Sequence, residues 1–307
     1  MMFTQNNHFQ MGYGRDHFLR PNKEAPWAFM IGRTKRPVQD WRSELMRAAQ
    51  EIRAFGGPQI CLLVDGSFAS QVMAHAFKWA DVPHRAVVPR FEKDLNLAAV
   101  SLAVTTLENL GTPFEIREMN LQQFLEDPAT RQLALRYSTD QVHQLLAMGL
   151  MRNFSIQGKF LVVPAGIPSM RLNETGWHLE EFESRYGLMR FAADLKLRGV
   201  PAFFKWSPEL MMSFLLDPTL REIVTNPAQN LQMGPAQWLS IYRNYFPVQE
   251  LKSFNRPDRK SSLEKKFQRQ VRKTPHFHAM IYSFPYADYR LQLDFRPPRI
   301  QPRKVAA

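Results

Sequence analysis

The chain has 307 residues, a formal net charge of +12 and a hydrophobic fraction of 45%. This length allows one large domain or two small ones with a sizeable core, and the composition is that of a globular protein. No apolar run approaches the roughly 20 residues of a membrane-spanning helix, and the amino terminus lacks a secretory signal pattern, so we expect a cytoplasmic protein. The single cysteine, Cys61, excludes an intrachain disulfide framework and a cysteine zinc site and is expected in the core.

Taken in chain order, residues 1–38 are expected to form an irregular arm or a short edge element, because prolines interrupt a polar, aromatic-rich sequence. Strands and helices are then predicted to alternate from residue 39 to about 170. The expected helices cover residues 39–55, 68–80, 97–110, 121–125 and 130–151, and the expected strands cover residues 59–64, 85–88, 114–119 and 160–163. This alternation predicts an α/β fold with a parallel sheet flanked by helices, in which ligands bind at the carboxyl ends of the strands.

The strongest functional signal lies in residues Ile60–Ala74, with the sequence ICLLVDGSFASQVMA. Five apolar residues predict a strand buried on both faces, and a tight turn containing Gly66 connects it to a helix. A glycine there lets backbone N–H groups approach a ligand, and the helix presents its positive amino terminus, which suits a phosphate. The alternative is an ordinary β-turn-α corner without a ligand, because short glycine-containing motifs often match by chance.

These residues resemble the PP-loop of ATP pyrophosphatases, whose pattern S-G-G-x-D-S follows the first strand. The six positions here read Asp65, Gly66, Ser67, Phe68, Ala69 and Ser70. Gly66 and Ser70 match, whereas Asp65 adds a negative charge where phosphates would lie and Ala69 removes a carboxylate. The resemblance implies ATP as ligand, with Mg²⁺ as its companion, and contacts from Asp65, Gly66, Ser67, Phe68 and Ser70. The departures imply weak or absent hydrolysis.

Other segments extend the resemblance to a subgroup related to PAPS reductases, which is common in tailed phages. Residues 91–96 look like the asparagine-containing turn of that subgroup, and residues 164–168 resemble its glycine-containing loop, which adds Gly166 to the expected site. Residues 203–206 are interpreted as an aromatic strand, and Ser207 as the N-cap of a following helix, as in those proteins. A phage protein would lie in the host cytoplasm or in the virion.

Residues 171–307 are expected to form a mainly helical, basic region. Between Arg256 and Lys273, eight cationic side chains face only two acidic ones. Related proteins carry an Arg-x-Lys-x-x-Gly-x-Glu pattern here, and the loose match implies that Arg259 and Lys260 close over phosphates. The alternatives are a surface for nucleic acid or for an acidic protein, and a solvated basic helix.

Two further clusters carry weaker signals. The carboxylates of Glu174, Glu180, Glu181 and Glu183 are interpreted as a solvated acidic face in preference to a paired catalytic site. His276 and His278 alternate on an expected strand, but no third ligand lies near them, so no metal site is predicted.

The preferred function is a PP-loop-type adenine-nucleotide-binding protein, with an adenine nucleotide alpha hydrolase-like domain at residues 39–170. The resemblance implies weakened ATP pyrophosphatase or PAPS reductase-like chemistry, in which a substrate attacks the α-phosphate of ATP and pyrophosphate leaves. One alternative is a catalytically inactive descendant that serves as a structural or interaction protein, for example in a phage. The other is a basic nucleic-acid-binding protein. The sequence designates no catalytic residue.

Overall fold

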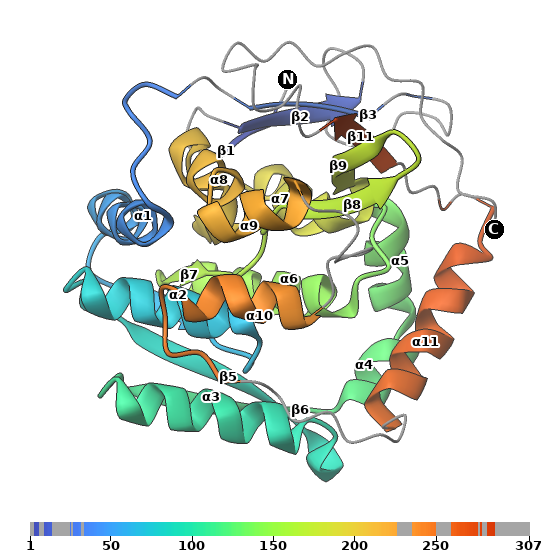
Figure 1. Ribbon diagram of the computed structural model, residues 1–307. Helices are drawn as coiled ribbons and strands as arrows, with labels where there is room; N and C mark the ends of the chain where they lie inside the picture. Colours follow the sequence, from blue (N-terminus) through green and yellow to red (C-terminus); the bar gives the residue numbers. More distant parts are fainter. Residues whose placement is uncertain are drawn as a thin grey trace.

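A five-stranded parallel sheet forms the centre of the molecule, with the strand order β10-β7-β4-β5-β6 (Figure 1). The computed structural model describes residues 3–5, 9–13, 25, 27–31, 34–225, 235–249, 259–275, 277 and 281–285. The strands of the central sheet are β4 (Ile60–Leu63), β5 (Arg85–Phe91), β6 (Phe114–Met119), β7 (Phe160–Val162) and β10 (Gly199–Val200). All four pairings between neighbouring strands are parallel. The expected α/β fold with a parallel sheet flanked by helices is therefore confirmed.

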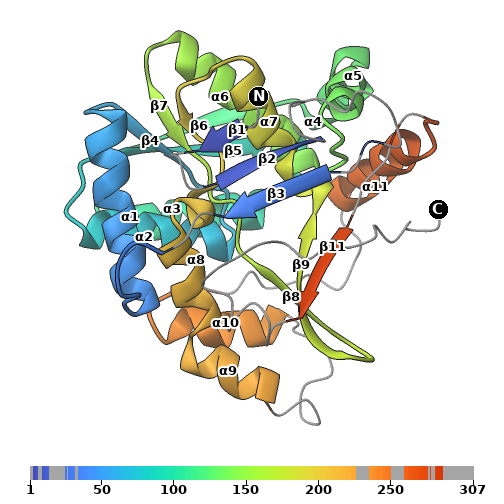
Figure 2. The same cartoon turned by 90° about the horizontal axis from the view of Figure 1, so that it is seen from above.

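Helices cover both faces of this sheet, and Figure 2 shows the strands between the two groups. The first face is covered by α1 (Trp41–Gly56), α2 (Phe68–Trp79) and α3 (Leu97–Asn109). The second face is covered by α4 (Leu121–Glu126), α5 (Pro128–Arg136), α6 (Val142–Ile156) and α7 (Gly187–Asp194). In β4, Ile60 and Leu62 pack on the first face, whereas Cys61 and Leu63 pack on the second. Burial raises the pKa of Cys61 to about 12, as expected for a core thiol.

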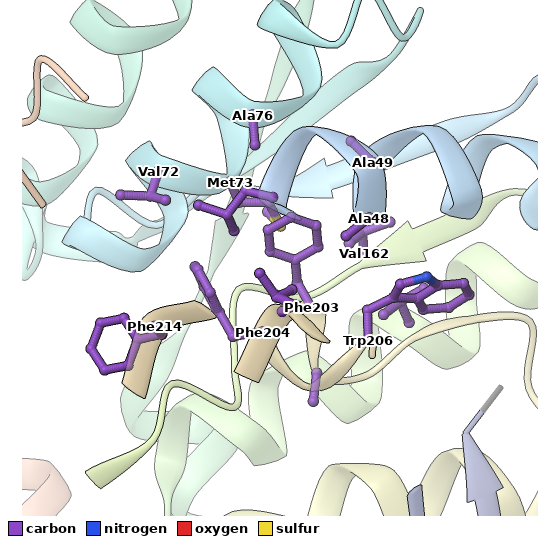
Figure 3. Packing of buried hydrophobic residues seen from close by; sticks show 14 of the residues in the cluster. Ala48, Ala49, Val72, Met73, Ala76, Val162, Phe203, Phe204, Trp206 and Phe214 are labelled. Atoms are coloured by element: carbon purple, nitrogen blue, oxygen red, sulfur yellow. The ribbon is translucent and has the colours of Figure 1, made fainter. Parts of the chain in front are cut away.

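The C-terminal region packs on the first face through aromatic side chains. It contributes η3 (Phe203–Lys205), α8 (Pro208–Leu215), α9 (Pro218–Thr225) and α10 (Pro235–Arg243). Figure 3 shows Phe203 and Phe204 beside Met73 of α2 and Ala48 of α1. Trp41 is 1% exposed, and its ring centroid lies 5.1 Å from that of Phe214 and 5.6 Å from that of Tyr242. The region is thus joined to the sheet domain by one continuous core.

Two predicted elements were wrong. Residues 203–205 form a 3-10 helix instead of a strand, because the amides of Lys205 and Trp206 donate to the carbonyl groups of Ala202 and Phe203. The aromatic side chains of this segment are all buried, so no alternation of exposure distinguished a helix from a strand. The helix expected over residues 130–151 is interrupted between α5 and α6, where Ser138 has a φ of 47°.

Two small antiparallel sheets were not expected. One lies in the range expected to form an irregular arm or a short edge element and consists of β1 (Phe3–Gln5), β2 (Phe9–Tyr13) and β3 (Trp27–Ile31). The other consists of β8 (Ser169–Asn173), β9 (Gly176–Phe182) and β11 (Ile281–Pro285). Both lie on the side of the molecule away from β5 and β6 (Figure 1).

Helices still predominate in the C-terminal region, as expected, and α11 (Arg259–Arg272) lies against α4 and α5. None of the helices in the described ranges has the length and apolarity that a bilayer crossing requires.

Candidate functional site

The strand order creates a switch point between β4 and β7. From β4 the chain proceeds through α2 to β5 on one side, whereas β7 and β10 are added on the other side. In open parallel sheets, ligands bind outside the carboxyl ends of the strands at the point where the strand order reverses. Here the two loops that leave this point contain Gly66 and Gly166, so the structure brings together two segments that the sequence had selected separately.

The β4–α2 turn is closed by its own side chains. The amide and the hydroxyl of Ser67 both donate to Oδ1 of Asp65, at 3.0 and 2.6 Å. Ser67 Oγ in turn caps α2 by accepting from the amide of Ser70 at 3.3 Å. Asp65 and Ser67 therefore take over donors at the positive end of α2 that a phosphate would otherwise engage.

Ser70 and Phe68 are directed into the protein. The hydroxyl of Ser70 donates to the carbonyl of Ser67 at 2.9 Å, and the side chain is fully buried. The ring of Phe68 packs on Tyr242, with centroids 5.8 Å apart. Of the six residues of the motif, those at the turn itself are therefore better placed for a ligand than Ser70.

Gly66 is required by the packing of the turn. Its φ is 81°, and a Cβ atom at this position would lie 2.2 Å from the carbonyl oxygen of Ala99 in α3. The sequence had explained this glycine by close approach of a phosphate, whereas in the structure the close approach is made by the backbone of α3.

The loop after β7 lies on a buried ion pair. Gly166 has a φ of 94°, and a Cβ atom there would lie 2.8 Å from Cγ of Lys205. The Lys205 ammonium donates to Oε1 of Glu181 at 2.6 Å, and the hydroxyl of Tyr186 donates to Oε2 of Glu181 at 2.7 Å. Desolvation by burial lowers the pKa of Lys205, and the neighbouring Glu181 opposes this effect. The ion pair between Lys205 and Glu181 thus holds η3 against β9 next to the loop that contains Gly166.

The interpretation of the acidic cluster as a solvated face was wrong for Glu181 and Glu183, which are 3% and 0% exposed. The Glu183 carboxylate accepts from the hydroxyl of Tyr13 and lies 3.3 Å from the guanidinium of Arg190. Burial lowers the pKa of Arg190, which is fully buried. One signal was available in the sequence: Glu181 follows Trp177 and Leu179 at the two-residue period of a strand face.

Three side chains able to carry positive charge influence one another electrostatically, and only Lys260 had been expected. His143 is the second residue of α6, Arg185 lies in η2 (Glu183–Tyr186), and Lys260 is the second residue of α11. Desolvation is the main cause that lowers the pKa of His143; Arg185 and Lys260 also lower it, whereas Asp65 and Asp140 raise it. The imidazole thus lies within electrostatic range of the β4–α2 turn and of both cations.

The other expected residues occupy different positions. Lys260 Nζ lies 5.7 Å from the ring centroid of Phe91, at the end of β5, and 3.8 Å from the carboxylate of Glu264. Asn96 closes the turn after β5 by accepting from the amide of Phe91 at 2.8 Å and donating to the carbonyl of Pro89 at 2.9 Å. The side chain of Arg259, together with His276 and His278, lies outside the described residues.

A cavity of about 660 Å³ lies at the carboxyl ends of β5 and β6, away from the switch point. Its lining includes the carboxylates of Glu92, Glu126 and Asp127 and a single cation, Lys93. This charge disfavours the phosphates of a nucleotide. In the part of the chain that the structure describes, no group of three histidine, cysteine or acidic side chains is arranged to hold a metal ion.

No protein-family model matches the chain, and no curated protein is similar to it. Among solved structures, the NH3-dependent NAD synthetase of Campylobacter jejuni shares 14% identity over 67% of this chain and 94% of its own, with a TM-score of 0.35. The NMN synthetase of Francisella tularensis shares 12% identity over 70% of this chain and 98% of its own, with a TM-score of 0.33. The glutamine-dependent NAD+ synthetase of Acinetobacter baumannii, in complex with ADP, shares 14% identity over 89% of this chain and 49% of its own, with a TM-score of 0.35. These values assign the chain neither a family nor an activity.

Proposed function

We propose that the protein binds an adenine nucleotide at the switch point between β4 and β7. The observation that carries this proposal is the position of the Gly66 turn and the Gly166 loop at the carboxyl ends of these two neighbouring strands. The resemblance of Asp65–Ser70 to a PP-loop supplies the adenine nucleotide and the adenine nucleotide alpha hydrolase-like assignment. The finer relationship, to PAPS reductase-like proteins of tailed phages, rests on residues 91–96 and 164–168 and belongs to the same proposal.

Hydrolysis of the nucleotide is proposed to be weak or absent. Asp65 places a carboxylate beside the amino terminus of α2 and engages the Ser67 amide, and Ala69 stands where the PP-loop pattern has its aspartate. Mg²⁺ would arrive with ATP and be held mainly by the phosphates, because it favours substrate phosphates with one or two carboxylates over a site built from protein alone. A binding protein descended from an enzyme fits these features better than an active pyrophosphatase.

Asp65→Asn is expected to strengthen ATP binding roughly tenfold, because it removes a like charge near the phosphates while keeping an acceptor for the Ser67 amide. Asp81→Asn is the matched control, since it removes the same charge from an exposed turn between α2 and β5, at the amino end of β5 and so on the side of the sheet opposite the site. Calorimetric titration with ATP, with and without Mg²⁺, measures both variants. Absence of ATP binding by the wild-type protein contradicts the proposal, and brisk release of pyrophosphate contradicts its weak-hydrolysis part.

A second candidate function, nucleic-acid binding, is favoured by the way in which α11 is docked. Phe267 and Val271 are buried in the core that α4 and α5 share, which fixes one face of the helix. Five cations of the same helix and its end are exposed, and one of them, Arg272, is paired with Asp140; the other four are Lys265, Lys266, Arg269 and Lys273. An ordered row of cations on a docked helix follows a phosphate backbone better than a free tail does.

Charge reversal of Lys266, Arg269 and Lys273 to glutamate is expected to weaken nucleic-acid binding, because each position supplies a phosphate contact. Each lost contact should reduce the slope of log affinity against log salt by about 0.9 for duplex DNA. Reversal of Lys78, Arg152 and Arg198, exposed cations on other elements, matches the change in net charge and is expected to leave the slope nearly unchanged. Equal slopes for the two triple variants would rule out α11 as the contact surface.

A further inference from the structure

We infer that the outer edge of β6 is a dimerisation surface, to which a second copy of this chain adds its own β6 in antiparallel orientation. The central sheets of the two copies then join into one continuous sheet across a two-fold axis. The inference rests on the geometry and charge of this edge and is independent of the proposed nucleotide site.

β6 is the longer of the two edge strands of the central sheet (Figure 1). The opposite edge strand, β10, has two residues and is followed by Pro201, which lacks an amide hydrogen. β6 has six residues, and each of them is in register with a residue of β5. Ile116, near the middle of β6, is 44% exposed, so the described part of the chain leaves the middle of this edge open to solvent.

The register with β5 shows which backbone groups of β6 point outward. The amide of Ala86 donates to the carbonyl of Pro113 at 2.9 Å, so the carbonyl of Pro113 faces β5. Because the backbone groups of successive residues in a strand point to opposite sides, those of Phe114, Ile116 and Glu118 face away from β5. No described residue forms a hydrogen bond with the outward backbone groups of these three residues. Each of them therefore offers an N–H and a C=O to an added strand.

Antiparallel pairing of β6 with its own copy is limited to a few registers, because an outward-facing residue must lie opposite another outward-facing residue. The register centred on Ile116 places this residue opposite its own copy and places Phe114 opposite Glu118. All three outward-facing residues then donate and accept a hydrogen bond. A shift of the register in either direction leaves Phe114 or Glu118 without a partner in the strand.

The charges of Glu115 and Arg117 favour the same register. When the pairing is centred on Ile116, Glu115 of each copy lies opposite Arg117 of the other copy. The two shifted registers instead place Glu115 opposite Glu115, or Arg117 opposite Arg117, and like charges in these positions repel. Charged side chains on an edge strand ordinarily prevent pairing. Here they oppose the shifted registers and permit the one that forms the most hydrogen bonds.

Both charged side chains are already held in place for this contact. Nε of Arg117 donates to Oε1 of Glu115 at 2.9 Å, and the guanidinium lies 4.7 Å from the ring centroid of Phe154 in α6. The side chains of Arg117 and Glu115 are 28% and 42% exposed, so each can also meet a charge on a neighbouring molecule. An unrelated strand would find the same backbone groups, but a second copy brings the matching charges by symmetry.

The test measures the association of the full-length protein by analytical ultracentrifugation over a concentration series, in which the wild-type protein is expected to form a dimer. Arg117→Glu and Glu115→Arg should each raise the dissociation constant of the dimer roughly tenfold to hundredfold, because each places like charges opposite each other at both symmetric positions. Arg221→Glu and Glu222→Arg are the matched controls. They make the same changes of charge at exposed positions in α9 and should leave the dissociation constant unchanged.

Mixing the two single variants tests the register directly. At these two positions, the Arg117→Glu chain carries only negative charge and the Glu115→Arg chain carries only positive charge. A mixed pair therefore restores opposite charges at both symmetric positions. We expect the mixture to form a heterodimer about as tightly as the wild-type protein forms its dimer, at concentrations where each variant alone is monomeric. Loss of folding cannot explain this result, because mixing would not repair it.

Ile116→Pro tests the contribution of the backbone. Proline removes an amide hydrogen that points outward, so the hydrogen bonds between β6 and β5 stay in place. This variant should be monomeric and should retain its fold in thermal unfolding. Ile116→Thr is the matched control, because it keeps the amide hydrogen and a β-branched side chain, and it should still form the dimer.

Two results would overturn the inference. One is a wild-type protein that stays monomeric throughout the concentration series. The other is a dimer that neither the charge variants nor Ile116→Pro weakens, since such a dimer must use another surface. If Ile116→Pro fails to fold, the mixing experiment decides, and the absence of a heterodimer from two folded variants counts against the β6 edge.

Discussion

Gly66→Ala is expected to lower the free energy of unfolding by roughly 2–5 kcal/mol, because backbone strain and a backbone clash add together. The φ of 81° is unfavourable for any residue with a Cβ atom, and the added methyl would lie 2.2 Å from the carbonyl oxygen of Ala99. This oxygen belongs to α3 and cannot rotate away as a flexible side chain would. Equilibrium denaturation with urea measures the loss.

Gly158→Ala is the matched control for this prediction. Gly158 has a φ of 72°, and a Cβ atom there would meet no atom within 4 Å. Its substitution therefore carries the backbone term alone, about 1–2 kcal/mol. The difference between the two variants isolates the contact of the turn with α3, and equal losses would show that α3 adjusts at little cost. Loss of nucleotide binding in any Gly66 variant must be interpreted together with this loss of stability.

The sequence predicted well those features that depend on neighbouring residues. The apolar run of β4 and the helical spacing of α2 lie within twenty residues of each other, and both elements were confirmed near their predicted bounds. The cap of α8 by Ser207 was confirmed for the same reason, since a cap acts on an amide three residues later.

Buried charges were missed because their partners are distant in the chain. Tyr13 and Glu183 are separated by 170 positions, and Lys205 and Glu181 by 24. When the partner of a carboxylate is not known, the sequence does not distinguish a buried carboxylate from one on the solvated surface. Glu181 and Glu183 were therefore assigned to the surface. Charged side chains are almost never fully buried unless they are paired, and pairing is a tertiary property.

Only the part of the candidate site whose residues are consecutive in the sequence could be predicted. The turn Asp65-Gly66-Ser67 was identified because a motif surrounds it, whereas no motif surrounds Arg185. For His143 the error was more specific: one continuous helix over residues 130–151 placed it in mid-helix, whereas the break at Ser138 places it at the start of α6. Next to the break, the hydroxyl of Thr139 donates to the carbonyl of Ser184, 45 positions away, and such a distant contact cannot be found in the local sequence.

Lys205→Met is expected to lower the free energy of unfolding by about 3–5 kcal/mol, because it leaves the buried carboxylate of Glu181 without its cation. The two side chains are 4% and 3% exposed, and their charged atoms are 2.6 Å apart. Methionine nearly matches the length of the lysine side chain, so the loss reports charge and not volume. Lys78→Met, an exposed lysine at the end of α2, is the matched control and should change stability by less than about 0.5 kcal/mol.

The double variant Lys205→Met with Glu181→Gln distinguishes a lost partner from a lost contact. Glutamine removes the unpaired charge and keeps an acceptor for the hydroxyl of Tyr186, which now donates to Glu181 at 2.7 Å. The double variant should therefore be more stable than Lys205→Met alone, with a coupling free energy on the order of 1–3 kcal/mol from urea denaturation of all four proteins. Additive losses would show that Lys205 and Glu181 act independently. Lys205 packs directly against Gly166 in the loop after β7. A measured coupling between Lys205 and Glu181 would therefore indicate that their ion pair also helps to fix the conformation of this loop.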